Sequence, residues 1–500
     1  MSKHKPDLVA LTSLLLVAST AAWGQVTVTP RVTVSETITD NVRLASSNPQ
    51  SEQITEITPG IRINIDGGRL KTYFDLGVSQ LIYAQNTSKD RTQIQNALNT
   101  FGTFEAIDNW AFVDFNGSIS RQSVSAFGTQ SVANTSVNDN QAEVSNYRIS
   151  PYLRGRLGYM ADYEARYSRS TTRSDSALVS DVDTADTSVK LSGNSAFRSL
   201  GWTGDASRQT IEYSAGRTTE ADRVNLGLTY SLSPQLNVFA SGGRESNNFV
   251  ALDKESSGTH SFGLNWAPSE ATKLTASRSK RPFGDAHNVT FEHRSARTVW
   301  RFTDSKDVVT SPSQTGFASF GSIYDLLFSQ FASTEPNPVA RAALVNAYLQ
   351  AYGLNPSATV VSNFLSSAVS LQRRQDLSFS LLGLRDTLTF IATRTDSSRL
   401  DTVSNAVDDL ANASRVRQQG FNVNYAHRLT PDYSLGVLWS QQKTSADNNT
   451  QDTRLRSLNM NLSGKVGKRS SAVLGLRRVV SDGLVPYTEN AITGNLNVQF

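Results

Sequence analysis

The chain has 500 residues, a formal net charge of +4 at pH 7, and 38% hydrophobic residues, with a mean hydropathy of −0.34. So small a charge predicts no nucleic-acid partner. After the N-terminus, no stretch approaches the ~18 apolar residues that a transmembrane helix needs. A soluble protein and a barrel with a polar lumen and polar loops share this average composition, so composition alone does not separate them.

Residues 1–24 have the features of a secretory signal peptide. Basic residues at positions 3–5 precede the apolar stretch Leu8–Val17, and Ala22–Gly24 precede an expected cleavage before Gln25. The apolar stretch is too short to span a membrane as a helix. The mature chain, residues 25–500, is therefore expected to leave the cytoplasm. The absence of cysteine fits a chain without a disulfide framework.

From Val26 onward, segments of roughly 9–15 residues alternate apolar and polar side chains, the weak signature of membrane barrel strands. A soluble sandwich also alternates, so the pattern leaves both architectures open. The clearest segments contain Phe74/Leu76/Val78, Val224/Leu226/Leu228/Tyr230, Phe262/Leu264/Trp266 and Leu458/Met460/Leu462.

The connections between these segments favour the barrel. Counted from Val26, those after even strands are tight and rich in Gly, Pro, Asn and Asp, as at 66–68, 108–109, 233–234 and 430–432. Those after odd strands are generally longer and polar, as at 38–53, 125–143, 246–257 and 397–413. Short periplasmic turns opposite long extracellular loops are typical of outer-membrane barrels. The sequence predicts an all-β, antiparallel transmembrane barrel of about 22 strands, within 18–22, with both termini at the periplasmic side.

Arginine dominates the basic residues, with 36 arginines and 12 lysines among 48. Arginine forms forked contacts with carboxylates and stacks on rings. The arginines either line a polar lumen and pair with its acids or form a surface for anionic ligands, and the sequence leaves both open. The candidate lumen-lining residues are Arg148, Arg154 and Arg156, which alternate with Ile149, Leu153 and Leu157.

One segment, residues 320–370, interrupts the strand pattern. Ile323, Leu326, Leu327 and Phe331 share a helical face, and Asn337-Pro338 is typical of a helix start. A stretch this long predicts a small helical insertion rather than an unstructured loop. By parity it leaves the extracellular end, where it caps the mouth, folds into the lumen as a plug, or forms an exposed hairpin without a gating role.

The last stretch, Glu489–Phe500, alternates on both faces. One face carries Ile492, Leu496, Val498 and Phe500, and the other carries Asn495, Asn497 and Gln499. We expect this strand to close onto the first strand around Val26–Thr37, with its polar face in the lumen beside Thr27 or its neighbours. The apolar alternation with a terminal Phe also resembles the signal read by the outer-membrane barrel assembly machinery, which makes that machinery an expected partner.

Two stretches resemble one known family. Val26–Ala45 (VTVTPRVTVSETITDNVRLA) is similar to the start of PEP-CTERM system-associated outer-membrane proteins, and Ser322–Ser357 (SIYDLLFSQFASTEPNPVARAALVNAYLQAYGLNPS) is similar to a helical insertion of that family. The resemblance implies a location in the outer membrane of a Gram-negative bacterium and a role in exopolysaccharide export or assembly. It implies exopolysaccharide and its periplasmic export components as partners, and no catalytic residues.

Candidates for catalysis or metal binding are few. His293 and Ser295 share a strand face, an arrangement similar to that of outer-membrane phospholipase barrels. Asp181, Asp183 and Asp186 are a candidate calcium loop that lacks the Gly and closing Glu of an EF-hand. A solvated barrel wall and a solvated acidic loop explain these residues more simply. We therefore expect neither an enzyme, a cofactor nor a metal site.

The sequence predicts a pore or channel in the outer membrane, in contact with its lipid, linked to exopolysaccharide export or assembly. A general porin for small solutes is the main alternative. A structural barrel and an outer-membrane lipase-type enzyme are further alternatives.

Overall fold

The computed structural model describes residues 24–85, 92–195, 197, 199–309, 328, 341, 342, 345, 364, 369–400, 408–447 and 452–500. The predicted signal peptide lies outside the described residues except for Gly24, where the first strand begins. No helix within the described ranges is long and apolar enough to cross a membrane.

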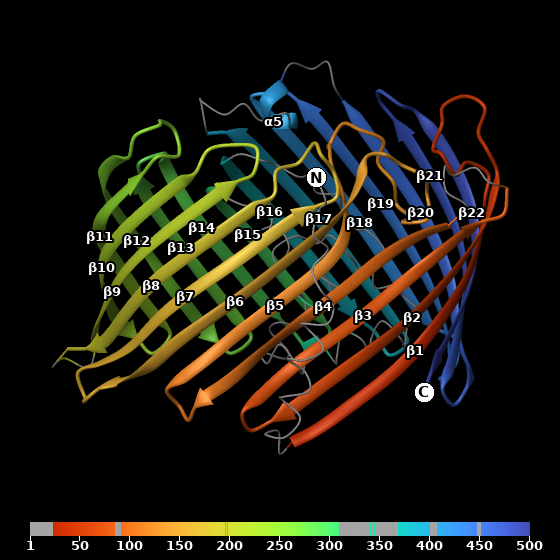
Figure 1. Cartoon of the computed structure of the whole chain (residues 1–500). Coiled ribbons are helices and arrows are strands. Elements are labelled where there is room, and N and C mark those ends of the chain that lie inside the picture. The colour runs from red at the N-terminus through yellow and green to blue at the C-terminus, as the bar shows by residue number, and fades with distance from the viewer. Residues whose placement is uncertain are drawn as a thin grey trace.

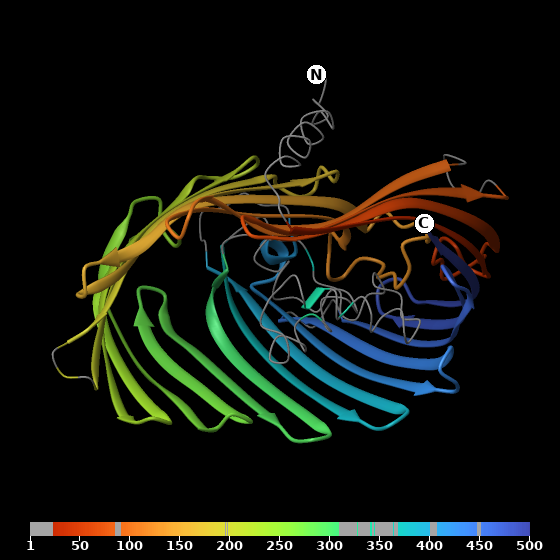
Figure 2. The same ribbon diagram turned by 90° about the horizontal axis from the view of Figure 1, so that it is seen from below.

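The described chain folds into a closed antiparallel barrel of 22 strands (Figure 1). Each strand pairs with the next one in sequence, and β22 pairs with β1, so the wall returns on itself (Figure 2). This confirms the predicted fold class and strand number. The strands are β1 Gly24–Thr39, β2 Glu52–Gly67, β3 Leu70–Tyr83, β4 Thr92–Ile107, β5 Ala111–Ser123, β6 Gln141–Leu157, β7 Ala161–Ser174, β8 Val182–Asn194, β9 Leu200–Tyr213, β10 Thr219–Ser233, β11 Leu236–Asn247, β12 Glu255–Ser269, β13 Thr272–Arg281, β14 Gly284–Arg294, β15 Thr298–Val309, β16 Ser370–Leu382, β17 Asp386–Arg399, β18 Arg415–Arg428, β19 Tyr433–Ala446, β20 Thr453–Gly467, β21 Ser470–Asp482 and β22 Tyr487–Gln499.

The alternation of side chains decides which residues face the lumen. In the β2–β3 pair, Arg62 is opposite Asp75 and Ile63 is opposite Phe74. Because successive side chains point to opposite faces of a strand, the charged pair lies on one face and the apolar pair on the other. Carried around all 22 strands, the register gives a polar inner wall and an outer wall with an apolar band, as a membrane barrel requires.

Loop length sorts by strand parity, as predicted. Connections after even strands are short, for example 68–69, 234–235 and 468–469, and those after odd strands are longer, for example 40–51, 124–140 and 400–414. We call the two ends of the barrel the short-turn end and the long-loop end, which are the periplasmic and extracellular ends of such barrels. Three connections after odd strands are no longer than the longest of the short turns, namely 214–218, 282–283 and 483–486. At 282–283, Pro282 follows Arg281 in a tight hairpin closed by Gly284 at φ +113°.

The seam between the first and last strands is offset from the predicted register. β22 pairs with residues 31–39 of β1, from Arg31 opposite Gln499 to Thr39 opposite Ala491. The expectation that its polar face lies beside Thr27 is therefore wrong, because the pairing starts several residues further along β1. The Asn495 and Asn497 side chains each donate at 2.8 Å, to Ser35 and Thr33 respectively.

Aromatic and charged residues occupy different ends of the outer wall. Trp202, Trp266, Trp300 and Tyr433 lie towards the short-turn end, as expected for an interfacial girdle. Tyr83, in contrast, is buried on the inner face near the long-loop end. Tyr83 therefore belongs to the mouth of the lumen and not to the outer wall.

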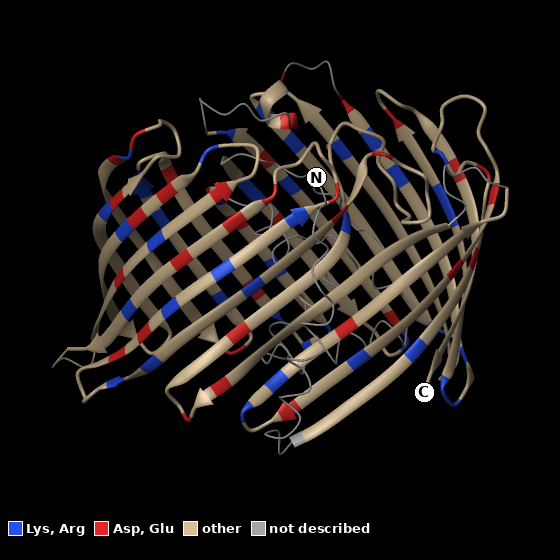
Figure 3. Cartoon of the chain, viewed as in Figure 1, with Lys and Arg blue, Asp and Glu red and all other residues tan. Residues whose placement is uncertain are grey.

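Towards the long-loop end, the outer face of β13–β21 is rich in cations, and Figure 3 shows Lys and Arg in the upper parts of the strands around β16–β20. We call this surface the cationic belt. Its basic residues are Arg278, Lys280, Lys306, Arg373, Arg394, Arg415, Arg417, Lys443, Arg454, Arg456 and Arg478. The acidic residues of the outer face of β13–β22 are Asp285, Asp304, Asp386, Asp396 and Asp482, of which Asp386 lies at the short-turn end.

The interruption predicted at 320–370 runs from 310 to 369, between β15 and β16, since β15 continues to Val309. Within it the structure describes six residues, one of which is the buried Val369 directly before β16. Phe328, Arg341, Ala342 and Val345 are helical, in agreement with the predicted helical insertion, and Phe364 forms a parallel bridge with Ser123. The remaining residues of the insertion lie outside the described ranges.

Candidate functional site in the lumen and its mouth

The inner wall holds its charges in close pairs. The Asp75 carboxylate lies 2.6 Å from Arg31 and 2.8 Å from Arg62, and the Tyr73 hydroxyl donates to it at 3.0 Å. Arg31 reaches Asp75 across Gly60 of β2, where a Cβ atom would lie 3.1 Å from its Nε atom and 2.7 Å from the Leu76 carbonyl oxygen. Glycine therefore provides the space in which the guanidinium crosses the neighbouring strand.

A second cluster repeats this arrangement on β11–β15. Arg281 makes a forked contact with Glu245, with both nitrogen–oxygen distances at 2.9 Å, and its third nitrogen lies 2.5 Å from Asp307. Glu245 is almost fully buried, and Asn247 also donates to it, at 3.1 Å. A forked arginine–carboxylate pair is both strong and directional, so it fixes the wall side chains in place.

Counted over all strands, the inner wall is close to neutral. The register places eighteen basic side chains on it: Arg31, Arg62, Lys71, Arg148, Arg154, Arg156, Arg166, Lys190, Arg223, Lys273, Arg281, Arg294, Arg301, Arg374, Arg399, Arg428, Lys465 and Arg477. It also places sixteen acidic ones: Glu52, Glu56, Asp66, Asp75, Glu105, Asp114, Asp162, Glu164, Asp186, Asp205, Glu245, Glu255, Glu292, Asp307, Asp376 and Glu489. Of the two interpretations of the arginine bias, pairing with lumen acids describes the inner wall.

The three arginines chosen from the sequence lie on the inner face of β6, opposite the exposed Ile149 and Leu153. The Arg154 guanidinium lies 4.1 Å from the Phe112 ring centre, Arg156 lies 2.9 Å from Asp162, and Arg148 lies 3.9 Å from Asp186. The structure does not bring the three together at one point. Any role of these arginines in passage through the lumen stays a prediction.

Phe328 of the insertion contacts the inner wall. The rings of Tyr73 and Phe101 stack with their centres 5.4 Å apart on the inner face of β3 and β4. Phe328 of the insertion packs edge-on against Phe101 at 5.8 Å, and the Arg341 guanidinium lies 4.8 Å from the Phe328 ring centre. At Phe328, therefore, the chain lies inside the barrel rather than above its rim.

Loop 124–140, between β5 and β6, contacts distant parts of the wall at the long-loop end. Tyr83 donates to the Thr135 carbonyl at 3.1 Å, Val137 N donates to the Val42 carbonyl at 2.9 Å, and the Tyr487 hydroxyl donates to the Gln130 carbonyl. Val137 packs on the buried group Val42, Ile54, Leu81 and Tyr83, and Val132 packs on Leu44, Leu455, Val479 and Tyr487. The loop thus follows the inner wall from β5 past β1 to β20–β22.

The same loop also meets loop 400–414 from the other side of the barrel. Loop 400–414 contains the short helix α5 (Asp409–Asn412), which starts at the N-cap Asp408. The Asp409 carboxylate accepts from the Ser125 hydroxyl at 2.7 Å and from Ala126 N at 2.6 Å. Since β5–β6 and β17–β18 are almost half the strand order apart, this contact joins two sides of the mouth.

An apolar cluster lies under that contact. It consists of the buried residues Ala126, Phe127, Leu410, Ala413, Val416 and Ala446, with Phe364 of the insertion packed against it. Burial raises the pKa of the Asp409 carboxyl above its usual range, although Ser125 and Ala126 donate to it. We call loop 124–140, α5 and Phe364 together the mouth cluster, and it is the best candidate for a gate.

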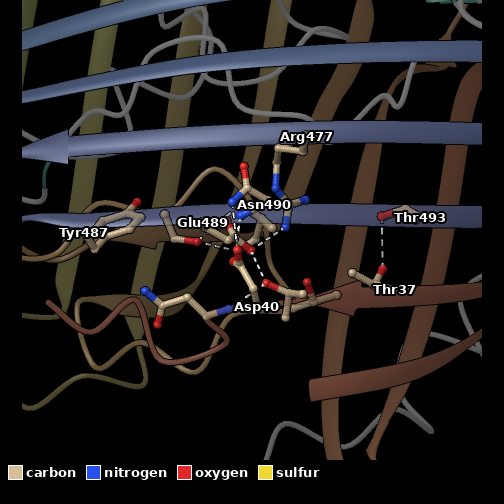
Figure 4. A network of polar contacts seen from close by, with 12 residues as sticks. Thr37, Asp40, Arg477, Tyr487, Glu489, Asn490 and Thr493 are labelled. Carbon is tan, nitrogen blue, oxygen red and sulfur yellow. Dashed lines mark hydrogen bonds and ion pairs between the residues drawn. The ribbon is translucent and has the colours of Figure 1, made fainter. Parts of the chain in front are cut away.

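The seam beside the mouth is held by a polar network (Figure 4). Glu489 of β22 is almost fully buried; it lies 2.7 Å from Arg477 and accepts from the Thr39 hydroxyl at 3.0 Å. Asp40, just beyond β1, accepts at 2.8 Å from the backbone of Asn490 and at 2.7 Å from its side chain.

The outer side of the seam carries Ile492, Leu496, Val498 and Phe500, and Phe500 N donates to the Pro30 carbonyl at 2.9 Å. Their role as an assembly signal stays a prediction.

The side chains considered for catalysis and for calcium binding have other partners or point apart. His293 Nδ1 bonds Thr272 at 2.8 Å, and the Ser295 hydroxyl bonds that of Thr298 at 2.7 Å, so each has a threonine partner. Asp183 and Asp186 lie in β8 rather than in a loop and point to opposite faces, because their spacing is odd. Within the described ranges, no group of three His, Cys, Asp or Glu side chains is placed to hold a metal ion.

The mouth cluster was not recognised from the sequence. Ser125 and Asp409 are separated by 284 residues, so no local periodicity links them. The only local signal was the capped start of α5 at Asp408-Asp409, which lies in a loop that the sequence marked only as long and polar.

No family model matches this chain, and no curated protein matches it. Several solved structures of siderophore receptors are similar in outline. They include the receptor PirA from Acinetobacter baumannii (8% identity, TM-score 0.49), the ferric preacinetobactin receptor BauA from the same organism (12%, 0.49) and the ferric enterobactin receptor PfeA (10%, 0.48). These matches cover 94–95% of this chain and 81% of each receptor. The assignment to an outer-membrane type of barrel stands on the strand register, the outer apolar band and the sorted loops of the chain itself.

Proposed function

We propose that this protein is a gated outer-membrane channel that helps to export or assemble a neutral, hydroxyl-rich polymer of the exopolysaccharide class at the cell surface. The observation that carries the proposal is the nearly neutral inner wall combined with the mouth cluster across its long-loop end. The resemblance of Val26–Ala45 and Ser322–Ser357 to PEP-CTERM-associated proteins supports the polysaccharide class.

The inner wall has the chemistry that such a polymer needs. Its arginines are neutralised by carboxylates, so the wall does not retain an anionic polymer by net charge. Hydroxyl and amide side chains between the charged pairs can exchange hydrogen bonds with sugar hydroxyls. Weak contacts of this kind, repeated along the inner wall, allow the polymer to pass and do not hold it in place.

Conductance in planar bilayers tests the gated channel. The full chain should stay mostly closed, and a variant lacking residues 310–369 should conduct, because Phe328 and Phe364 then no longer contact the inner wall and the mouth cluster. Deletion of the chromosomal gene should reduce surface polysaccharide, and a plasmid copy should restore it. Unchanged surface polysaccharide in the deletion strain would rule out the polysaccharide role while leaving the channel intact.

A general pore for small solutes is the alternative, favoured by loop 124–140 lying against the inner wall as a constriction. Liposome swelling with mono- and disaccharides separates the two. A general pore admits them in the full chain, whereas the gated channel admits them only after residues 310–369 are removed.

A further inference from the structure

The cationic belt faces lipid, at the long-loop end of the barrel. Its side chains share the outer face with the exposed apolar residues of the same strands, such as Leu458 and Leu476, and not with the lumen. We propose that this belt is a binding surface for phosphate-bearing lipid headgroups of the outer leaflet, with an acyl chain held in a groove at β20–β22. This inference does not depend on the proposed channel function.

The densest part of the belt surrounds Asp396. This single carboxylate lies 3.0 Å from Arg394, 3.2 Å from Arg415 and 2.7 Å from Arg417. Arg373 is directly opposite Asp396 in the strand register and lies 2.7 Å from Asp304. Asp396 is buried while the arginines are about half exposed, so the carboxylate fixes the guanidiniums but leaves an uncompensated positive charge. Planar guanidiniums suit the oxygens of a phosphate.

A groove of about 450 Å³ lies at the end of the belt, beside the seam. Its outward-facing lining combines the apolar Ile38, Leu458, Met460, Leu476 and Ile492 with the cation Arg478, and it also contains Asn490 and Asp40. The Asp40 carboxylate already accepts two hydrogen bonds from Asn490. Arg478 is paired with Leu458 and Asn490, one step along β21 from Leu476, which is paired with Ile492. A cation therefore stands directly on the extracellular side of an apolar floor, which is the order of headgroup and chain in a lipid of the outer leaflet.

The opposite side of the barrel provides the contrast. On the outer face of β9–β10, Lys254 lies 2.5 Å from Glu220 and 2.8 Å from Asp222, and Arg208 lies 3.6 Å from Glu220. Two cations meet two acids there, so the cluster closes on itself. Over β1–β12 the outer face carries Arg121, Arg169, Arg173, Arg208 and Arg244 against Glu36, Glu143, Asp183, Glu212, Glu220 and Asp222. The excess of positive charge is confined to one side.

The position of the belt on the outer wall favours a lipid, rather than a soluble anion, as its ligand. A soluble polyanion approaching the channel meets the loops and the inner wall, whereas the belt lies on the outer wall beside the apolar band. Basic residues near a membrane surface attract anionic headgroups over about a Debye length. The groove supplies the apolar contact that a free phosphate ion cannot use.

The test compares binding of bisphosphorylated lipid A and of the same lipid stripped of its phosphates. The purified full chain in an uncharged detergent is incubated with each lipid, and bound lipid is counted by native mass spectrometry. The wild-type protein should bind the phosphorylated lipid at least about tenfold more tightly, because several cations act near one headgroup. Equal binding of the two lipids by the wild-type protein overturns the proposal without any substitution.

A triple variant, Arg415→Gln, Arg417→Gln and Arg478→Gln, locates the surface. It should lose about tenfold in affinity for the phosphorylated lipid, while the matched variant Arg208→Gln and Lys254→Gln should bind as the wild-type does. Heat-modifiable migration on gels checks that both variants are folded barrels. A folded triple variant with wild-type affinity would show that the belt is not the binding surface.

Discussion

At the short-turn end, adjoining strands are joined by tight turns, the outer face carries aromatic rings, and the charge pairs such as Arg156–Asp162 are exposed. At the long-loop end the same strands carry the cationic belt outside and the mouth cluster inside, and buried pairs such as Arg477–Glu489 connect them to the seam. The difference shows that long loops folding back over the wall bury polar groups that need fixed partners, which tight turns do not.

Breaking a buried ion pair at the long-loop end should have the largest effect. Glu489→Ala leaves the Arg477 guanidinium largely buried without its carboxylate, and we expect the barrel to lose about 3–5 kcal/mol of unfolding free energy. Unfolding in urea, followed by tryptophan fluorescence, measures it. At the short-turn end, Asp162→Ala removes the exposed partner of Arg156 and should cost about 0–1 kcal/mol. Equal losses in the two variants would contradict the comparison.

The second-largest effect is expected from removing an apolar side chain from the mouth cluster. Leu410 is almost fully buried among the other residues of the cluster. Leu410→Ala should therefore weaken the docking of loop 400–414 by about 2–5 kcal/mol. Hydrogen exchange at the amide of Ala126 should accelerate, and the open fraction in bilayers should rise. Leu384→Ala, at an exposed short turn, is the matched control and should change neither quantity. Unchanged exchange in Leu410→Ala would mean that the loops dock without this cluster.

Acidity should tighten the same contact by a smaller amount. The docked Asp409 has a raised pKa, so docking takes up a proton. The contribution is fully present below the ordinary carboxyl pKa of about 4 and is lost as the pH rises through the raised value. The open fraction of the full chain should therefore increase with pH in this window. Besides burial, the negative charge of the neighbouring Asp408 also raises the pKa of Asp409. Asp409→Asn should flatten the profile, and a profile that keeps its shape in this variant would assign the titration elsewhere.

A smaller effect than that of Glu489→Ala is expected at the partly buried seam. Asn495→Ala removes one hydrogen bond to Ser35, and Asn497→Ala removes one to Thr33. Each should lower the unfolding free energy by about 0.5–1.5 kcal/mol, since the inner wall lets water replace part of the lost bond. Urea unfolding of the two single variants and the double variant measures this. A loss as large as that of Glu489→Ala would show that the whole seam, and not only its long-loop end, holds the barrel closed.

The wall of this barrel could be predicted from the sequence because its signals are local. Alternation at period two and turn chemistry after every second strand gave the strand number and the sorting of loops. The mouth cluster could not be predicted, since it depends on contacts between loops far apart in sequence. The belt was hidden for a different reason. Arg373 and Arg374 are neighbours in sequence, yet Arg373 meets Asp304 outside and Arg374 meets Asp376 inside. Only the register tells which arginine of such a pair faces lipid.

The tight hairpin at 282–283 gives the rim an uneven height. It joins β13 and β14, which have 10 and 11 residues, whereas β2 and β4 have 16 each. At about 3.3 Å per residue, the wall is shorter here by roughly 15–20 Å of strand. The rim is therefore lowest on this side, where Arg278 and Lys280 begin the belt.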